Sequence, residues 1–188
     1  EPFKGGECLT CHNVHGSNIA GMLVNPQKQV CGSCHEPYKG LKEAKSTHSP
    51  FSQGNCTKCH NPHKAKLKVL LLAQGADLCL SCHQELKARM GTEKVHSPAQ
   101  KECLDCHKPH FAAADNLLPT KVLNVCEQCH ESAKPAFAKA HLNIDASVMT
   151  CMNCHDPHAS KDPKFFKNTI HAPFASRSCE ECHIAAKP

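Results

Sequence analysis

The sequence predicts an elongated, mostly irregular fold of short α-helices, built from tandem repeats and with essentially no sheet. Three observations predict it. Leu, Ile, Val and Phe together number only 34 of 188 residues and Trp is absent, so the chain is too poor in apolar residues to fill an ordinary core. Thirteen Pro and nine Gly favour short helices joined by loops. Finally, 16 Cys and 16 His far exceed ordinary use, which indicates that something other than aliphatic packing organises the chain.

The chain is a tandem repeat. Its opening cysteines Cys8, Cys56, Cys103 and Cys151 recur with a nearly constant period of about 48 residues. We expect residues 1–188 to form a single array of four units, 8–35, 56–83, 103–130 and 151–183, of which the last is longer, as is typical of a terminal repeat. An apolar pair recurs at the same offset in each unit, and we expect it to pack against whatever the unit binds. These pairs are Met22-Leu23, Leu70-Leu71, Leu117-Leu118 and Phe165-Phe166.

Every cysteine belongs to a Cys-x-x-Cys-His motif, and each unit holds an opening and a closing copy. This motif is the covalent attachment signature of c-type haem, in which two thiols add to the porphyrin vinyl groups and the adjacent His binds the iron. Such motifs usually lie on short helices. We therefore expect eight covalently attached haems that themselves form the core. The motifs are Cys8, Cys11 and His12; Cys31, Cys34 and His35; Cys56, Cys59 and His60; Cys79, Cys82 and His83; Cys103, Cys106 and His107; Cys126, Cys129 and His130; Cys151, Cys154 and His155; and Cys179, Cys182 and His183.

Three other uses of the cysteines compete with haem. A disulfide scaffold gives no reason for a His after every pair. Four-thiolate zinc sites fit the spacing between the inner cysteines of the first three units, but they would need no histidine. A thioredoxin-like redox pair is excluded by number, because one or two such motifs serve a catalyst and eight do not.

Eight histidines remain after the eight motif histidines are assigned to iron, which predicts two His ligands on every iron. Four of them trail an opening motif His by three residues, and four lie seven to ten residues upstream of an opening or closing motif. The repeated positions argue against surface side chains. The eight are His15, His48, His63, His96, His110, His141, His158 and His171.

A trailing His cannot bind the iron of the motif His three residues before it, because both imidazoles project from one side of the chain. In the local scheme that we expect, the trailing His15, His63, His110 and His158 serve the closing haem of their own unit. The upstream His48, His96, His141 and His171 then serve the opening haems of the first to fourth units. In the alternative, each upstream His serves the motif just after it. Either way, a spacing of three residues brings neighbouring haems close, and we expect one continuous chain of haems.

Charge and hydropathy exclude several classes of function. The formal charge of +5 is scattered without blocks, so there is no nucleic-acid footprint. The longest apolar run, residues 69–73, is far short of a membrane span. The chain opens on Glu1 without a leader, so we expect a mature product whose export signal has been removed. Haem attachment requires export with reduced thiols, and we therefore expect a periplasmic or extracellular location.

These motifs resemble the doubled Cys-x-x-Cys-His family of multihaem c-type cytochromes. The family unit reads Cys-x-x-Cys-His-x-Pro-His, an apolar pair and a second Cys-x-x-Cys-His, and the match covers residues 8–183, with Val14 in place of Pro in the first unit. The family includes periplasmic cytochromes of porin–cytochrome conduits, and similar bis-His cytochromes polymerise into extracellular filaments. The resemblance implies electron transfer in metal-reducing or syntrophic microbes.

We expect a non-enzymatic electron conductor. Two His ligands leave no coordination site for a substrate, and they lack the Met that raises the potential of cytochromes c, so low potentials follow. The partners would be redox cytochromes or solid extracellular acceptors, with an outer-membrane porin or further copies of the chain as assembly partners. The alternative is a multihaem reductase of small nitrogen or sulfur oxyanions. It would need an open iron, signalled by a Cys-x-x-Cys-Lys motif or by too few spare histidines, and neither sign is present.

Overall fold

The structure, a computed structural model, describes residues 2–176 and 178. The chain divides into two compact units, each built from two segments. Unit 1 comprises Glu1–Cys82 and Glu102–Lys121, and unit 2 comprises His83–Lys101 and Val122–Pro188. These boundaries cut through the second and third sequence repeats.

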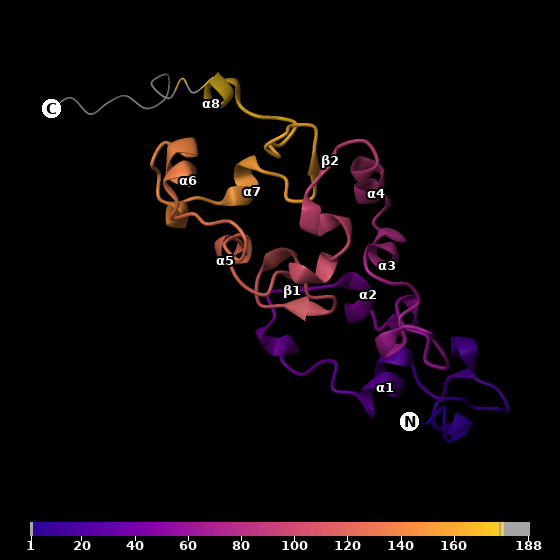
Figure 1. The fold of residues 1–188 in the computed structure, drawn as a ribbon. Helices are drawn as coiled ribbons and strands as arrows, with labels where there is room; N and C mark the ends of the chain where they lie inside the picture. The colour runs from indigo at the N-terminus through magenta and orange to yellow at the C-terminus, as the bar shows by residue number, and fades with distance from the viewer. Residues whose placement is uncertain (1, 177, 179–188) are drawn as a thin grey trace. The chain divides into compact units, whose positions relative to one another are not determined.

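Unit 1 consists of one-turn helices, most of them 3₁₀ helices (η), and two very short strands (Figure 1). None of its described helices exceeds six residues. Its elements are η1 (Cys8–Thr10), η2 (Ala20–Met22), α1 (Gln27–Gly32), η3 (Leu41–Glu43), β1 (Ser46–Thr47), α2 (Ser49–Ser52), η4 (Cys56–Lys58), η5 (Lys68–Leu70), α3 (Ala76–Leu80), η7 (Cys103–Asp105), β3 (Phe111–Ala112) and η8 (Asp115–Leu117).

Unit 2 has the same character, and α4, the longest helix of its described part, spans seven residues. The amide of Gly91 closes this helix on the carbonyls of Lys87 and Ala88. The elements are α4 (Gln84–Met90), β2 (Lys94–Val95), η6 (Ser97–Gln100), α5 (Val122–Cys126), α6 (Pro135–Ala140), η9 (Ala146–Val148), α7 (Cys151–Cys154), β4 (Ala159–Ser160) and α8 (Ala172–Ser176).

Each unit contains an antiparallel pair of two-residue strands, and the two pairs have the same register. In unit 1, Ser46 of β1 faces Ala112 of β3. In unit 2, Lys94 of β2 faces Ser160 of β4. The two sets of partners have the same separation in the sequence, so the same pairing recurs one repeat later. In each case the first strand ends just before an upstream His, and the second begins just after a trailing His.

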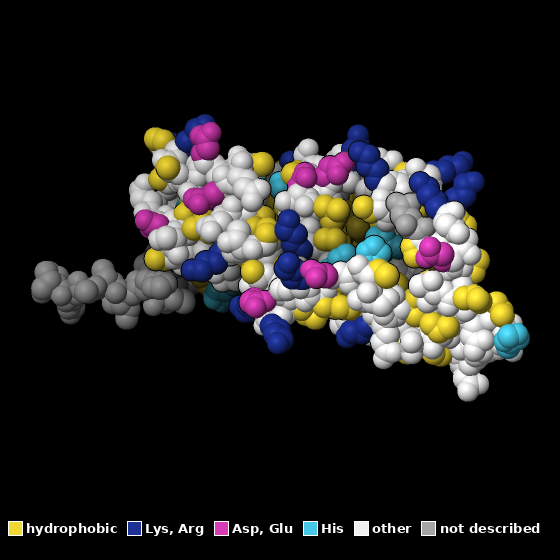
Figure 2. All heavy atoms as spheres, turned by 90° about the horizontal axis from the view of Figure 1, so that it is seen from below, with side chains coloured by type: hydrophobic (Ala, Val, Ile, Leu, Met, Phe, Trp, Pro, Cys, Tyr) yellow, Lys and Arg dark blue, Asp and Glu magenta, His cyan; other side chains and the backbone are white. Residues whose placement is uncertain are grey.

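Very little of the described chain is buried. Its buried hydrophobic residues are Ala112, Leu118 and Ala159, whereas Val69 and Val148 are 74% and 76% exposed. Figure 2 shows many hydrophobic side chains at the surface beside histidines and charged groups. The prediction of an irregular, short-helical fold with essentially no sheet and no aliphatic core is confirmed. No helix among the described residues is long and apolar enough to cross a membrane.

Candidate haem-binding sites

The described Cys-x-x-Cys-His motifs lie on or at the end of single helical turns, as expected. The first three opening motifs form η1, η4 and η7, and the fourth forms α7. In each, the amide of the motif His donates to the carbonyl of the first Cys at 2.9–3.0 Å. The closing motifs at Cys31 and Cys126 make the same bond at 3.0 and 2.9 Å. One turn therefore carries both thiols and the imidazole, as attachment of a single porphyrin requires.

Fourteen of the sixteen predicted attachment cysteines lie in the described part of the chain, and each has a free thiol. None of these fourteen cysteines is in a disulfide in the described structure. In the closing motifs the second thiol is exposed, at Cys34, Cys82 and Cys129, whereas in the opening motifs it is half-buried, at Cys11, Cys59, Cys106 and Cys154. The eighth motif, with Cys179, Cys182 and His183, lies outside the described residues, so its role stays a prediction.

The imidazole of each opening motif is oriented by a backbone carbonyl nine residues further along the chain. The four Nδ1···O distances are 2.7 Å for His12–Gly21, 2.8 Å for His60–Val69, 2.8 Å for His107–Asn116 and 3.0 Å for His155–Lys164. A carbonyl only accepts, so Nδ1 is the protonated nitrogen and Nε2 keeps its lone pair. This is the state in which an imidazole binds a metal, with its other nitrogen fixed by an outer partner.

The apolar pair of each sequence repeat helps to place the carbonyl that binds the motif His, because the backbone of the pair is hydrogen-bonded to the motif. Its first residue accepts a hydrogen bond at 2.8 Å from the amide that follows the motif His, as Leu70 does from Asn61. It also adopts a left-handed conformation in all four units, with φ of 52°, 59°, 59° and 62° at Met22, Leu70, Leu117 and Phe165. The sequence predicts side-chain packing at these positions but not this backbone role. The regular offset of the pair from its motif was the only signal of it.

Three upstream histidines have the same tautomer as the opening ones. Nδ1 of His48 lies 3.0 Å from the carbonyl of Pro109, and Nδ1 of His96 lies 2.9 Å from that of Pro157. Each of these prolines directly precedes a trailing His, which is His110 in the first case and His158 in the second. Nδ1 of His141 donates to the carbonyl of Phe137 at 2.9 Å. The predicted ligands on both sides of the iron are thus prepared in the same way.

The structure brings eight of the predicted histidines together in four pairs. An iron bonded to two imidazoles at about 2 Å each sets their ring centroids about 6 Å apart. The separations in the four pairs are close to this value, so each pair is a candidate for holding one haem iron. Their ring centroids are separated by 5.7 Å for His12–His63, 6.3 Å for His60–His110, 6.0 Å for His96–His130 and 6.3 Å for His141–His155.

These pairs differ from the local scheme. His63 and His110 lie beside the opening His12 and His60 and not at the closing haem of their own units. Oδ1 of Asn61 accepts hydrogen bonds from the amides of His63 and Lys64 at 3.1 and 3.3 Å, which forms a tight turn after the motif.

The two paired upstream histidines also differ from that scheme. His96 lies beside His130, the closing His of the unit that His96 precedes. His141 lies beside His155 of the motif just after it, as the alternative proposed. For His63, His96, His110 and His141 the ring neighbours thus differ from the partners of the local scheme, and which iron each serves stays a prediction.

The remaining predicted ligands have the following places in the described structure. His15, His35 and His171 have no histidine ring partner among residues 2–176 and 178. His83 is the residue at the N-cap position of α4, and the amide of His158 donates to Oδ1 of Asp156 at 2.9 Å. Within the same residues, no group of three or more His, Cys, Asp or Glu is placed to hold a metal ion alone. A pair of imidazoles suits a porphyrin, which fills the other positions of its iron.

The thiols of successive motifs meet in unit 1. Burial raises the pKa of Cys31 to about 11. The Cys56 thiol of the next sequence repeat lies within hydrogen-bonding reach and contributes to this rise. Burial likewise raises the pKa of Cys79 to about 11, with the Cys103 thiol as its hydrogen-bonded neighbour. The pKa of Cys59 is raised by burial and by the thiol of Cys82, in the closing motif of the same sequence repeat. The attachment points of the second to fifth motifs therefore follow one another in space.

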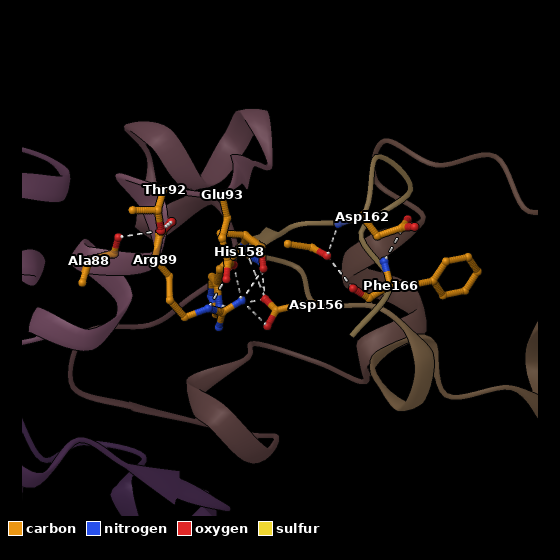
Figure 3. A network of polar contacts seen from close by, with 10 residues as sticks. Ala88, Arg89, Thr92, Glu93, Asp156, His158, Asp162 and Phe166 are labelled. Carbon is orange, nitrogen blue, oxygen red and sulfur yellow. Dashed lines mark hydrogen bonds and ion pairs between the residues drawn. The ribbon is translucent and has the colours of Figure 1, made fainter. Parts of the chain in front are cut away.

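An ion-pair network in unit 2 holds residues 156–159, the turn that contains the trailing His158 (Figure 3). The guanidinium of Arg89, on α4, lies 3.1 Å from Glu93 and 2.9 Å from Asp156, and it also donates to the carbonyl of Ala159. Burial alone would raise the pKa of Asp156, but hydrogen bonds from the amides of His158 and Ala159 and from Arg89 lower it below its ordinary value. Arg89 thus ties α4 to the turn that carries His158.

Short helices bearing paired thiols, with imidazoles fixed at Nδ1 and paired at the spacing of one iron, define a c-type cytochrome with several haems and an electron-transfer role. The family described as "Doubled CXXCH motif" matches residues 1–40, 48–88, 96–135 and 145–170. The chain belongs to this family, and haem c bound covalently at its motifs is the cofactor. A search of the curated proteins matched none to this chain.

Proposed function

We propose that this chain carries eight haems and conducts electrons along them without catalysing a reaction of its own. The observation that carries the proposal is the series of neighbouring thiols. Cys31 lies against Cys56, and Cys79 against Cys103, so haems attached to consecutive motifs would be neighbours in space. Electron exchange between haems requires such closeness. With 188 residues for eight motifs, the polypeptide has little material with which to separate them.

The paired histidines support a conducting role over a catalytic one. Haem supplies one-electron exchange between ferric and ferrous iron, and the protein supplies ligands, orientation and burial. Where two imidazoles occupy both axial positions, as the spacing of His60 and His110 favours, no position is left for a substrate. Two His ligands also favour a low potential. The carbonyls on Nδ1 hold the rings in place, so a change of iron charge needs little movement of the ligands.

We further propose that the protein is exported and serves extracellular electron transfer, in the periplasm or at the cell surface. Its partners would be other redox cytochromes and solid ferric acceptors. It would act either as a component of an outer-membrane conduit or as a subunit of an extracellular filament. Covalent haem attachment at reduced thiols supports export, and the family supports electron transfer.

The proposal is tested by the reoxidation of the reduced holoprotein. Dithionite-reduced protein, freed of excess reductant, is mixed with ferric citrate or ferric oxide particles, and the haem α-band is followed. We expect rapid reoxidation of all haems by both. Parallel mixtures with nitrite, hydroxylamine or tetrathionate test the reductase alternative. Catalytic consumption of any of these substrates over many turnovers, or failure to reduce the ferric acceptors, would overturn the proposal.

Electron microscopy of the purified protein separates the two assemblies. Helical filaments with haems running from end to end would assign the chain to the polymer. Discrete particles would exclude the filament and leave a conduit component or a soluble electron shuttle. Mass spectrometry of the same sample counts the attached haems, and we expect eight on each chain.

A further inference from the structure

We infer that the repeats interlock through their iron ligands: the trailing histidine of one repeat is the distal ligand of the opening haem of the preceding repeat. His63 would complete the iron of the haem at Cys8 and Cys11, and His110 the iron of the haem at Cys56 and Cys59. The inference rests on the proposed function only in that haems are attached at these motifs. It assigns which histidine serves which iron, and this pairing differs from the pairing that the sequence spacing favours.

The first pair is built from two segments of unit 1. The rings of His12 and His63 are 5.7 Å apart and inclined by 29°, and Nδ1 of His12 is held by the carbonyl of Gly21. The amide of His63 donates to Oδ1 of Asn61. On its other side His63 meets the ring of Phe3 at 5.2 Å. The contact with the Phe3 ring restricts the position of the His63 imidazole.

The second pair has the same arrangement one sequence repeat later. The rings of His60 and His110 are 6.3 Å apart, and Nδ1 of His60 is held by the carbonyl of Val69. Phe51 stacks on His110 at 4.7 Å and 21°, in the place that Phe3 has beside His63. The amide of His48 also donates to the carbonyl of His110 at 2.8 Å, next to the β1–β3 pair. His110 is thus held from three sides.

The sequence separation of the two pairs supports one rule for both. From His12 to His63, and again from His60 to His110, the chain advances by one repeat plus three residues. Those extra residues are the ones that put a trailing His behind its motif. An opening haem would therefore remain without its sixth ligand until the next repeat has been made and has folded against it.

The test combines loss of a ligand with loss of a haem. In the holoprotein, His63→Ala should convert one haem to high spin, measured by electron paramagnetic resonance of the oxidised protein. A second variant, which combines Cys8→Ser, Cys11→Ser and His12→Ala, lacks the first haem, as mass spectrometry verifies. Adding His63→Ala to this variant should produce no further high-spin haem, because the iron that His63 serves has already gone. His110→Ala in the same background is the matched control, and it should still produce one.

The opposite result overturns the inference. If His63→Ala adds a high-spin haem to the variant without the first haem, His63 serves another iron. Should the alanine variants fold poorly, His63→Met keeps a ligand in place. It should raise the potential of one haem and give the near-infrared band of a His/Met iron, and both signals should vanish when the first haem is absent. These readouts are independent of electron conduction, since the comparison is between single and combined variants.

Discussion

The carbonyl oxygen of Val69 lies 2.8 Å from Nδ1 of His60, and Val69 places it there in a left-handed backbone conformation with φ of 48°. For a β-branched residue this conformation is strongly disfavoured. Gly21 and Asn116 have the same position in the first and third repeats, with φ of 74° and 56°. Both residue types enter the left-handed region more readily. The second repeat therefore holds the imidazole of its opening motif with backbone strain at Val69. The first and third repeats have less strain at this position because it is occupied by Gly21 and Asn116.

Val69→Asn should stabilise the holoprotein by about 1 kcal/mol, because it relieves left-handed strain at a largely exposed side chain. Guanidinium-induced unfolding of the oxidised protein, followed by the Soret band, measures the change. Val69→Ala is the control, since it removes the β-branch but lacks the tolerance of Asn for the left-handed region, so its gain should be smaller. An equal gain in both variants would show that the preference of Asn for this backbone conformation does not matter.

Arg89→Leu should destabilise the holoprotein by about 2 kcal/mol, because hydrogen bonds to two carboxylates are lost. The side chain of Glu93 is only 5% exposed, so its charge would be left buried without its partner. Lys39→Leu is a matched control, because it removes an exposed ion pair with Glu36. Chemical denaturation measures both. A loss at Arg89 no larger than that at Lys39 would contradict the role of the network.

The contribution of Asp156 should depend on pH. Its pKa is lowered in the folded protein, so its stabilising effect is fully present above the pKa of the unfolded state, about 3.9, and is lost as the pH falls through the folded value. Asp156→Asn should therefore be less stable than the parent at pH 6, and the difference should shrink below pH 4. Denaturation midpoints at several pH values measure it. A difference that does not change with pH would show that the carboxylate charge is not involved.

A chain made without haem attachment should not fold. Only Ala112, Leu118 and Ala159 are buried hydrophobic residues among those described, far too few to offset the loss of chain entropy. Far-ultraviolet circular dichroism and hydrogen exchange of the haem-free, reduced chain should show a disordered polypeptide with unprotected amides. A cooperative unfolding transition in this material would contradict the view that haem supplies the core.

The sequence predicts the motifs, the repeat and the irregular fold because covalent attachment fixes residue type and spacing locally. It does not predict which histidine rings become neighbours, since His63 and His12 are separated by more than one repeat of the chain. Nor does it predict the role of Val69, because a Val is among the residues least expected in a left-handed turn. Local chemistry was readable from the chain, while contacts between repeats required the three-dimensional arrangement.

The ligation of the irons decides between a conductor and an enzyme, and electron paramagnetic resonance of the fully oxidised holoprotein measures it. Spin quantitation against the haem content is the decisive reading. We expect only low-spin ferric signals, which together account for eight haems on each chain. A high-spin signal approaching one haem per chain would reveal an open iron and contradict the proposal of a conductor with two His ligands on every iron.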